Sequence, residues 1–158
     1  QERGRRAGTP DVAGAAAFAA AATATVAARD ADVVRLGALR DRLVAGLRDR
    51  LGEVVAPTVL DGGAPVAAGI AHVVLADVEA EALLFLLDAA GVRASAASSC
   101  SSGAQDPSHV LAAMGVDRMV AQGSRRLSLG HTTTEADIEA ALECIPPAVE
   151  RLRAHGGG

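Results

Sequence analysis

The stretch "RRLSLGHTTTEADIEAAL", residues 125–142, joins a short alternating segment to the start of a helix. Polar and apolar residues alternate in its first half, as they do in a half-buried β-strand. Thr134 and Asp137 then form a capping-box pattern, which marks the N-terminus of a final helix. The stretch therefore predicts a strand followed closely by a helix, the unit of a layered α/β or α+β fold.

Strand and helix signals continue to alternate outward from this stretch. Pro10 and Asp11 suit the first turn of an alanine-rich helix that reaches about Ala28, and "RDAD" at 29–32 predicts a break or kink before a second helical stretch over 33–51. We expect further strands at 58–60, 70–75 and 92–95, and helices over 78–91 and 107–114. Pro146 and Pro147 are expected to interrupt the final helix.

The composition excludes several classes of function. The chain has 158 residues, the size of one domain, with two phenylalanines, no tryptophan or tyrosine, and a net charge of −4. A chain without aromatic platforms or a basic excess is not expected to bind nucleic acid or an anionic membrane. The alanine-rich run 12–28 reads as too weakly hydrophobic to span a bilayer. Two cysteines do not make a disulfide framework, so we expect a cytoplasmic protein.

One absence bears directly on chemistry. All 15 residues counted as lysine or arginine are arginines. The chain therefore contains no side-chain amine that could form a Schiff base with an aldehyde cofactor.

Four motifs in order resemble one enzyme family. "QERGRRAGT" (1–9), "SSCSSG" (98–103), "PSHVLAAMG" (107–115) and "RRLSLG" followed by "TTTEADIEAAL" (125–142) are similar to the C-terminal part of NifS/IscS-like cysteine desulfurases. The resemblance implies an α/β fold, namely the C-terminal part of the aspartate-aminotransferase-like architecture (pyridoxal phosphate fold type I), with a small mixed sheet packed by helices. It also implies a homodimer with pyridoxal 5′-phosphate as cofactor, which removes sulfur from L-cysteine and leaves L-alanine.

Cys100 is the candidate catalytic residue. The resemblance makes it the thiol that forms a persulfide and passes sulfur to an acceptor protein. Its loop, 94–107, consists largely of serine, alanine and glycine, which bury little apolar surface and lose little rotamer entropy, so we expect the loop to move. Without the resemblance, a small-residue linker with an incidental cysteine would explain the same residues equally well.

Arg126 and Thr9 are the candidate binding residues. Arg126 matches the arginine that holds the substrate carboxylate in this family, a task suited to a guanidinium fork. Arg125 stands where an apolar residue is usual, and we assign it no role. Thr9 matches a threonine that reaches the phosphate of the partner subunit's cofactor, and Arg6 a residue on the phosphate side. From the residues alone, Arg126 could be a strand-end arginine paired with an acid, and Thr9 an ordinary helix start.

The histidines and Cys144 are expected to be structural, and no metal site is expected because none of them has a second ligand at metal spacing. Residues 1–30 are expected to end the cofactor-binding domain and to form a linker helix, residues 31–155 to form the small domain, and residues 156–158 to be a disordered tail. The cofactor lysine would come from a missing N-terminal portion or a companion chain, so we expect this chain alone to be inactive.

Two other functions are compatible with the sequence. The chain could be a non-catalytic desulfurase-like domain that carries persulfide or serves as an interaction module. The presence of loop, arginine and threonine together favours the enzyme. A generic α/β domain is the third reading, and the identity of the sulfur acceptor, in iron–sulfur cluster assembly or another route, does not follow from the sequence.

Overall fold

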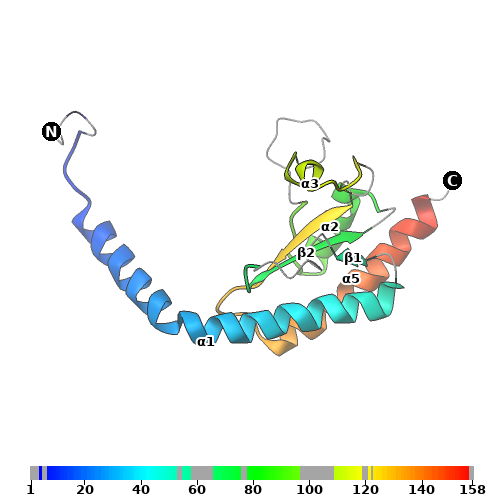
Figure 1. The fold of residues 1–158 in the computed structure, drawn as a ribbon, viewed down its shortest axis with the longest axis horizontal. Coiled ribbons are helices and arrows are strands. Elements are labelled where there is room, and N and C mark those ends of the chain that lie inside the picture. Colours follow the sequence, from blue (N-terminus) through cyan, green and yellow to red (C-terminus); the bar gives the residue numbers. More distant parts are fainter. Residues whose placement is uncertain are drawn as a thin grey trace.

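The chain forms a three-stranded sheet with helices packed on one face (Figure 1). The computed structural model describes residues 4, 7–52, 55–57, 66–75, 78–96, 109–118, 121 and 123–156. Its helices are α1 (Val12–Leu51), α2 (Ala80–Ala89), α3 (His109–Ala113) and α5 (Glu135–Gly156), and its strands are β1 (Val55–Pro57), β2 (Ile70–Leu75) and β3 (Ser124–Ser128). This architecture confirms the predicted α/β class.

The described strands pair antiparallel in the order β1-β2-β3, where a mixed sheet was predicted. The end of β2 lies opposite the start of β3, with Val74 facing Ser124. The chain therefore returns from α2 and α3 to the same end of the sheet that it left, which makes the two strands antiparallel. The strand predicted at 92–95 contributes only an isolated bridge at Ser95, and the one predicted at 58–60 lies outside the described residues.

Helix α1 is unbroken through 29–32, where a break or kink was predicted. Arg29 and Asp30 form an ion pair on the exposed surface of this segment, with 3.1 Å between Arg29 Nε and Asp30 Oδ1. Figure 1 shows a bend between the N-terminal part of the helix and the part that packs on the sheet. Only the second part has a buried stripe, which consists of Leu39, Leu43, Leu47 and Leu51 at a spacing of four residues.

The N-terminal part of α1 extends away from the sheet as an exposed arm (Figure 1). Phe18, Val26 and Val33 are 77%, 65% and 51% exposed. By length and composition α1 is apolar enough to cross a membrane. Its most apolar stretch of 18 residues has a mean hydropathy of 1.4, and none of that stretch is buried. The prediction that 12–28 is too weakly hydrophobic to span a bilayer is thus not supported. A core helix of a soluble protein or a signal sequence near an N-terminus can have the same length and hydropathy.

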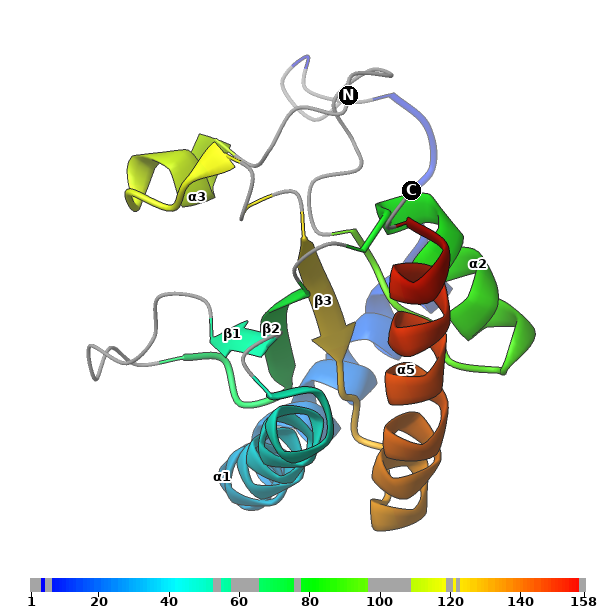
Figure 2. The ribbon, with the colours of Figure 1, turned by 90° about the vertical axis from the view of Figure 1, so that its right-hand side faces the viewer.

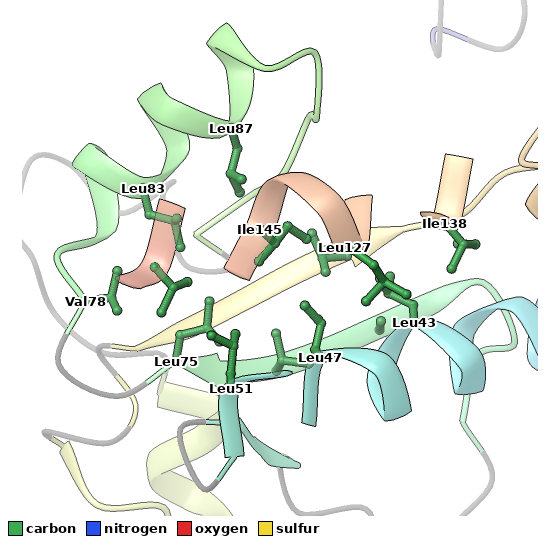
Figure 3. Close-up of a cluster of buried hydrophobic side chains, with 14 of the residues drawn as sticks. Leu43, Leu47, Leu51, Leu75, Val78, Leu83, Leu87, Leu127, Ile138 and Ile145 are labelled. Atoms are coloured by element: carbon green, nitrogen blue, oxygen red, sulfur yellow. The ribbon is translucent and has the colours of Figure 1, made fainter. Parts of the chain in front are cut away.

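The core lies between the sheet and helices α1, α2 and α5 (Figure 2). Figure 3 shows Leu43, Leu47 and Leu51 of α1 pointing toward the sheet, with Leu83 and Leu87 of α2 and Ile145 of α5 completing the cluster. The core is built from aliphatic residues. The two phenylalanines of the chain, Phe18 and Phe85, are both largely exposed and do not contribute to it. Burial of leucine, isoleucine and valine therefore provides most of the hydrophobic stabilisation.

Helix α5 passes through Pro146 and Pro147 without interruption, contrary to the prediction. A proline has no N–H, so Pro146 cannot donate the helical hydrogen bond to the carbonyl of Leu142. The guanidinium of Arg50, at the end of α1, donates to that carbonyl instead. The helix continues to Gly156, so the first residue of the predicted disordered tail is helical. The predicted cap is confirmed, since Thr134 N–H donates to Asp137 Oδ2 over 2.8 Å.

We expect Arg50→Gln to lower the free energy of unfolding by about 1–2 kcal/mol, because it leaves the Leu142 carbonyl without its donor. In a Pro146→Ala background the helix supplies an N–H of its own, so the same substitution is expected to cost much less. Urea unfolding of the four proteins in this double-mutant cycle measures the difference. Arg48→Gln, an exposed change in the same last turn, is the control. Equal costs of Arg50→Gln in both backgrounds would contradict the assignment.

Candidate functional site

Strands β2 and β3 present two chemically different faces. Side chains alternate across a strand, and the inner face, which packs on the helices, carries Ala71, Val73, Leu75, Arg125 and Leu127. The opposite face, called the outer face below, carries Ile70, His72, Val74, Ser124, Arg126 and Ser128. The outer face thus holds a histidine, an arginine and two serines, and it is the candidate functional site.

Two glycines fix the register of this pair of strands. A Cβ on Gly123 would lie 2.4 Å from the Leu75 carbonyl oxygen, and one on Gly69 would lie 2.5 Å from that of Leu129. Both contacts are with backbone, so a side chain at either position would push the strands apart. Close approach at both ends keeps His72 opposite Arg126.

Arg126 lies on the outer face with an exposed side chain and a fixed backbone. Its N–H donates to the Ser95 carbonyl over 2.9 Å, and its own carbonyl accepts from Ser95 N–H over 3.1 Å. Because both backbone groups point toward Ser95, Arg126 and His72 form a non-hydrogen-bonded pair across β2 and β3. In such pairs the side chains approach most closely. The guanidinium of Arg126 is therefore held beside the imidazole of His72.

His72 and Ser124 form the second feature of the site. The His72 Nε2 and Ser124 Oγ atoms are 2.5 Å apart, and Ser124 is only 3% exposed. Burial, together with the positive charge of Arg126, holds the pKa of His72 below its ordinary value of 6.5. The imidazole is therefore neutral at physiological pH, and Arg126 provides the positive charge on this part of the face.

Arg125 points the other way, into the core. It is 1% exposed, and its guanidinium donates to the Ser124 carbonyl over 2.7 Å and to the Val78 carbonyl over 3.3 Å. Burial lowers the pKa of Arg125, and the nearby carboxylate of Glu79 partly offsets this effect. The two adjacent arginines thus have separate roles, since Arg125 joins β3 to the start of α2 while only Arg126 can meet a ligand.

Of the other predicted site residues, Thr9 is among those that the structure describes. Cys100 and Arg6 lie outside the described residues. Thr9 is exposed and precedes the N-cap of α1, Asp11, at the far end of the arm from the sheet (Figure 1). Its neighbour Gly8 has a φ of 98°, a left-handed conformation that favours glycine. The sequence contains no lysine.

Sequence reasoning treated His72 as structural and did not consider Ser124. The available signal was alternation, which puts residues 72, 124 and 126 on one face once β2 and β3 are paired in the observed register. That register cannot be read from either strand alone. Among the described residues, no group of three or more histidine, cysteine, aspartate or glutamate side chains could hold a metal ion.

The helices and the antiparallel sheet have the α/β architecture of the aspartate-aminotransferase-like fold, which NifS-like proteins of known structure share. The chain belongs to the aminotransferase class-V family, which matches residues 1–141.

Its relatives are cysteine desulfurases. It is 49% identical over 154 residues to the IscS-like cysteine desulfurase of Mycobacterium tuberculosis, covering 97% of this chain and 38% of the relative. It is 37% identical to the cysteine desulfurase NifS of Azotobacter vinelandii, covering 97% and 37% respectively. The chain therefore spans somewhat over a third of the length of these curated relatives.

Solved structures show the same likeness. A NifS-like protein matches with a TM-score of 0.76 and 30% identity, over 96% of this chain and 37% of the other. The NifS-like protein from Rickettsia africae matches with a TM-score of 0.77 and 27% identity, over 95% of this chain and 38% of the other.

Proposed function

We propose that this chain is the C-terminal portion of a cysteine desulfurase that takes sulfur from L-cysteine, giving L-alanine and a persulfide on Cys100. The persulfide is then passed to a sulfur-acceptor protein in the cytoplasm. Family membership and the names of the relatives support the reaction class. The assignment of roles to residues of this chain rests on the outer face of the sheet.

The observation that carries the proposal is the opposite burial of two adjacent arginines. Arg125 is 1% exposed and bound to backbone carbonyls, whereas Arg126 is exposed beside a neutral histidine. A guanidinium on a fixed strand can bind a carboxylate through two parallel hydrogen bonds and so orient an amino acid. This arrangement favours Arg126 as the group that holds the carboxylate of L-cysteine.

Chain connectivity supports Cys100 as the sulfur carrier. Ser95 is held to Arg126 by two backbone hydrogen bonds, and Cys100 follows five residues later. Five residues span at most about 18 Å, so the thiol is tethered within reach of an amino acid bound at Arg126. In the proposed step the Cys100 thiolate attacks the substrate sulfur. The S–S bond forms as the substrate Cβ–S bond breaks, and the carbon skeleton keeps the electron pair, takes up a proton and leaves as L-alanine.

Pyridoxal 5′-phosphate, when bound, supplies the electron sink that makes the substrate Cβ–S bond breakable. The proposed contribution of this chain to cofactor binding is the hydroxyl of Thr9. Because the arm holds Thr9 far from the Arg126 of the same chain, Thr9 would serve the cofactor of a second subunit in a homodimer (Figure 1). A companion chain or N-terminal portion would supply the lysine, so the chain by itself is proposed to be inactive.

We expect Arg126→Gln to lower kcat/KM for L-cysteine about a hundredfold in the native, cofactor-loaded assembly that contains this chain. The loss should be mainly in KM, because two charged hydrogen bonds to the carboxylate are removed. L-Alanine formation measures the rate, and the isolated 158-residue chain, expected to form none, is the blank.

Arg48→Gln, an exposed change on α1, is the matched control and should leave both constants unchanged. Arg126→Lys keeps the charge without the fork and should recover only part of the affinity. An unchanged KM in Arg126→Gln would contradict the proposed carboxylate site. Transfer of a preformed persulfide by the wild-type assembly, with no alanine formed from L-cysteine, would favour a non-catalytic persulfide carrier.

A further inference from the structure

We propose that His72 is a positioning residue whose protonation is coupled to the binding of a carboxylate on Arg126, so that this site holds carboxylates more tightly as the solution is acidified. The inference rests on the proposed carboxylate-binding role of Arg126. Protonation of His72, on the neighbouring strand, would control the affinity of this site for carboxylates.

The geometry of the sheet brings the two groups together. His72 and Arg126 face each other as a non-hydrogen-bonded pair on the outer face, the arrangement in which cross-strand side chains approach most closely. The ring of His72 is held by Ser124, with 2.5 Å between Nε2 and Oγ, and Ser124 is almost completely buried. A change of charge on His72 must therefore be felt at Arg126, because the ring is held beside it.

The charges around His72 determine the sign of the coupling. Burial and Arg126 both keep the pKa of His72 below 6.5. On the paired strands the charged group opposite His72 is Arg126, and the exposed Arg93 lies two residues before Ser95, which pairs with Arg126. The outer-face neighbours of His72 on β2 itself, Ile70 and Val74, are apolar. Burial and the charge of Arg126 thus act in the same direction, and both disfavour the protonated ring.

A bound carboxylate changes that balance. Its negative charge offsets Arg126 and so raises the pKa of His72 relative to the ligand-free protein. By linkage, the protein with carboxylate bound takes up a proton that the free protein does not, and affinity rises as pH falls through the interval between the two pKa values. The ligand-free pKa is lowered from 6.5, so affinity is expected to increase on the acid side and to be constant once the pH exceeds the His72 pKa of the carboxylate-bound protein.

The test uses the native, cofactor-loaded assembly and L-alanine as the carboxylate probe. We expect its Kd to fall about fivefold between about pH 7.5 and about pH 5.5, relative to the change seen in His72→Gln. Glutamine retains a side chain that can bond to Ser124 but does not titrate. His131→Gln, an exposed histidine in the turn before α5, is the matched control and should keep the wild-type pH dependence. L-Alaninamide, which lacks the carboxylate, should bind with the same pH dependence to wild type and His72→Gln.

A measurement on the unmutated protein guards against a folding defect in the variant. The ring carbon resonance of His72 should titrate at higher pH with saturating L-alanine than without it. An unchanged titration, or the same pH dependence of Kd in wild type and His72→Gln, would overturn the coupling while leaving the Arg126 site in place. If Arg126→Gln bound L-alanine as tightly as wild type, the carboxylate site itself would be wrong, and the coupling with it.

Discussion

Replacing Cys100 with serine is expected to abolish sulfur transfer while leaving the binding of L-cysteine nearly unchanged. The reaction requires a thiolate that attacks the substrate sulfur, and a serine hydroxyl is neither ionised at neutral pH nor able to form the S–S bond of a persulfide. In the proposed site, binding depends instead on Arg126, whose backbone is held by two hydrogen bonds to Ser95. The substitution should therefore separate chemistry from binding.

The measurement is a single-turnover reaction of the native assembly with L-cysteine, followed by mass analysis of this chain. Wild type should gain the mass of one sulfur atom on the peptide containing Cys100 and release one equivalent of L-alanine, whereas Cys100→Ser should do neither. Cys144→Ser is the matched control, because Cys144 lies on α5 among core residues and should not carry sulfur. Normal alanine release by Cys100→Ser, or its loss in Cys144→Ser, would show that another group accepts the sulfur.

Local signals in the sequence predicted those parts of the fold that depend on neighbouring residues. Strand β2 begins and ends at the predicted residues 70 and 75. The capping pair of Thr134 and Asp137 is present, and the hydrogen bonds from Thr134 lower the pKa of Asp137. Arg126 was placed on a strand, where it lies. Each of these features follows from alternation or from contacts three residues apart.

Features that depend on distant residues could not be predicted in this way. The continuity of α5 through its prolines depends on Arg50, which is 92 residues away from Leu142 in sequence. The antiparallel sheet and the pairing of His72 with Arg126 depend on the register of two strands that are far apart in sequence and approach closely at Gly69 and Gly123. The direction of each arginine follows from that register, so the residues alone left open which one faces the site.

Arg125→Ala is expected to lower the free energy of unfolding by about 3 kcal/mol, the largest effect on stability among the substitutions considered. It removes a large buried side chain and leaves the Val78 carbonyl, at the entry to α2, without its donor. Arg125→Leu fills most of the space but leaves the same carbonyl without its donor, so it should recover only the packing part of the loss and cost about 1–2 kcal/mol. Urea unfolding of the native assembly measures both changes.

Arg125→Leu and Arg126→Gln together test whether the two arginines have separate roles. Because Arg125 faces the core, folded Arg125→Leu should keep the wild-type KM for L-cysteine, whereas Arg126→Gln should keep wild-type stability and lose affinity. An increase in KM for Arg125→Leu comparable to that of Arg126→Gln would mean that the core-facing arginine also controls the ligand. In that case Arg125 would act through the β3 backbone, since its guanidinium is bound to the carbonyl of Ser124, directly before the two arginines.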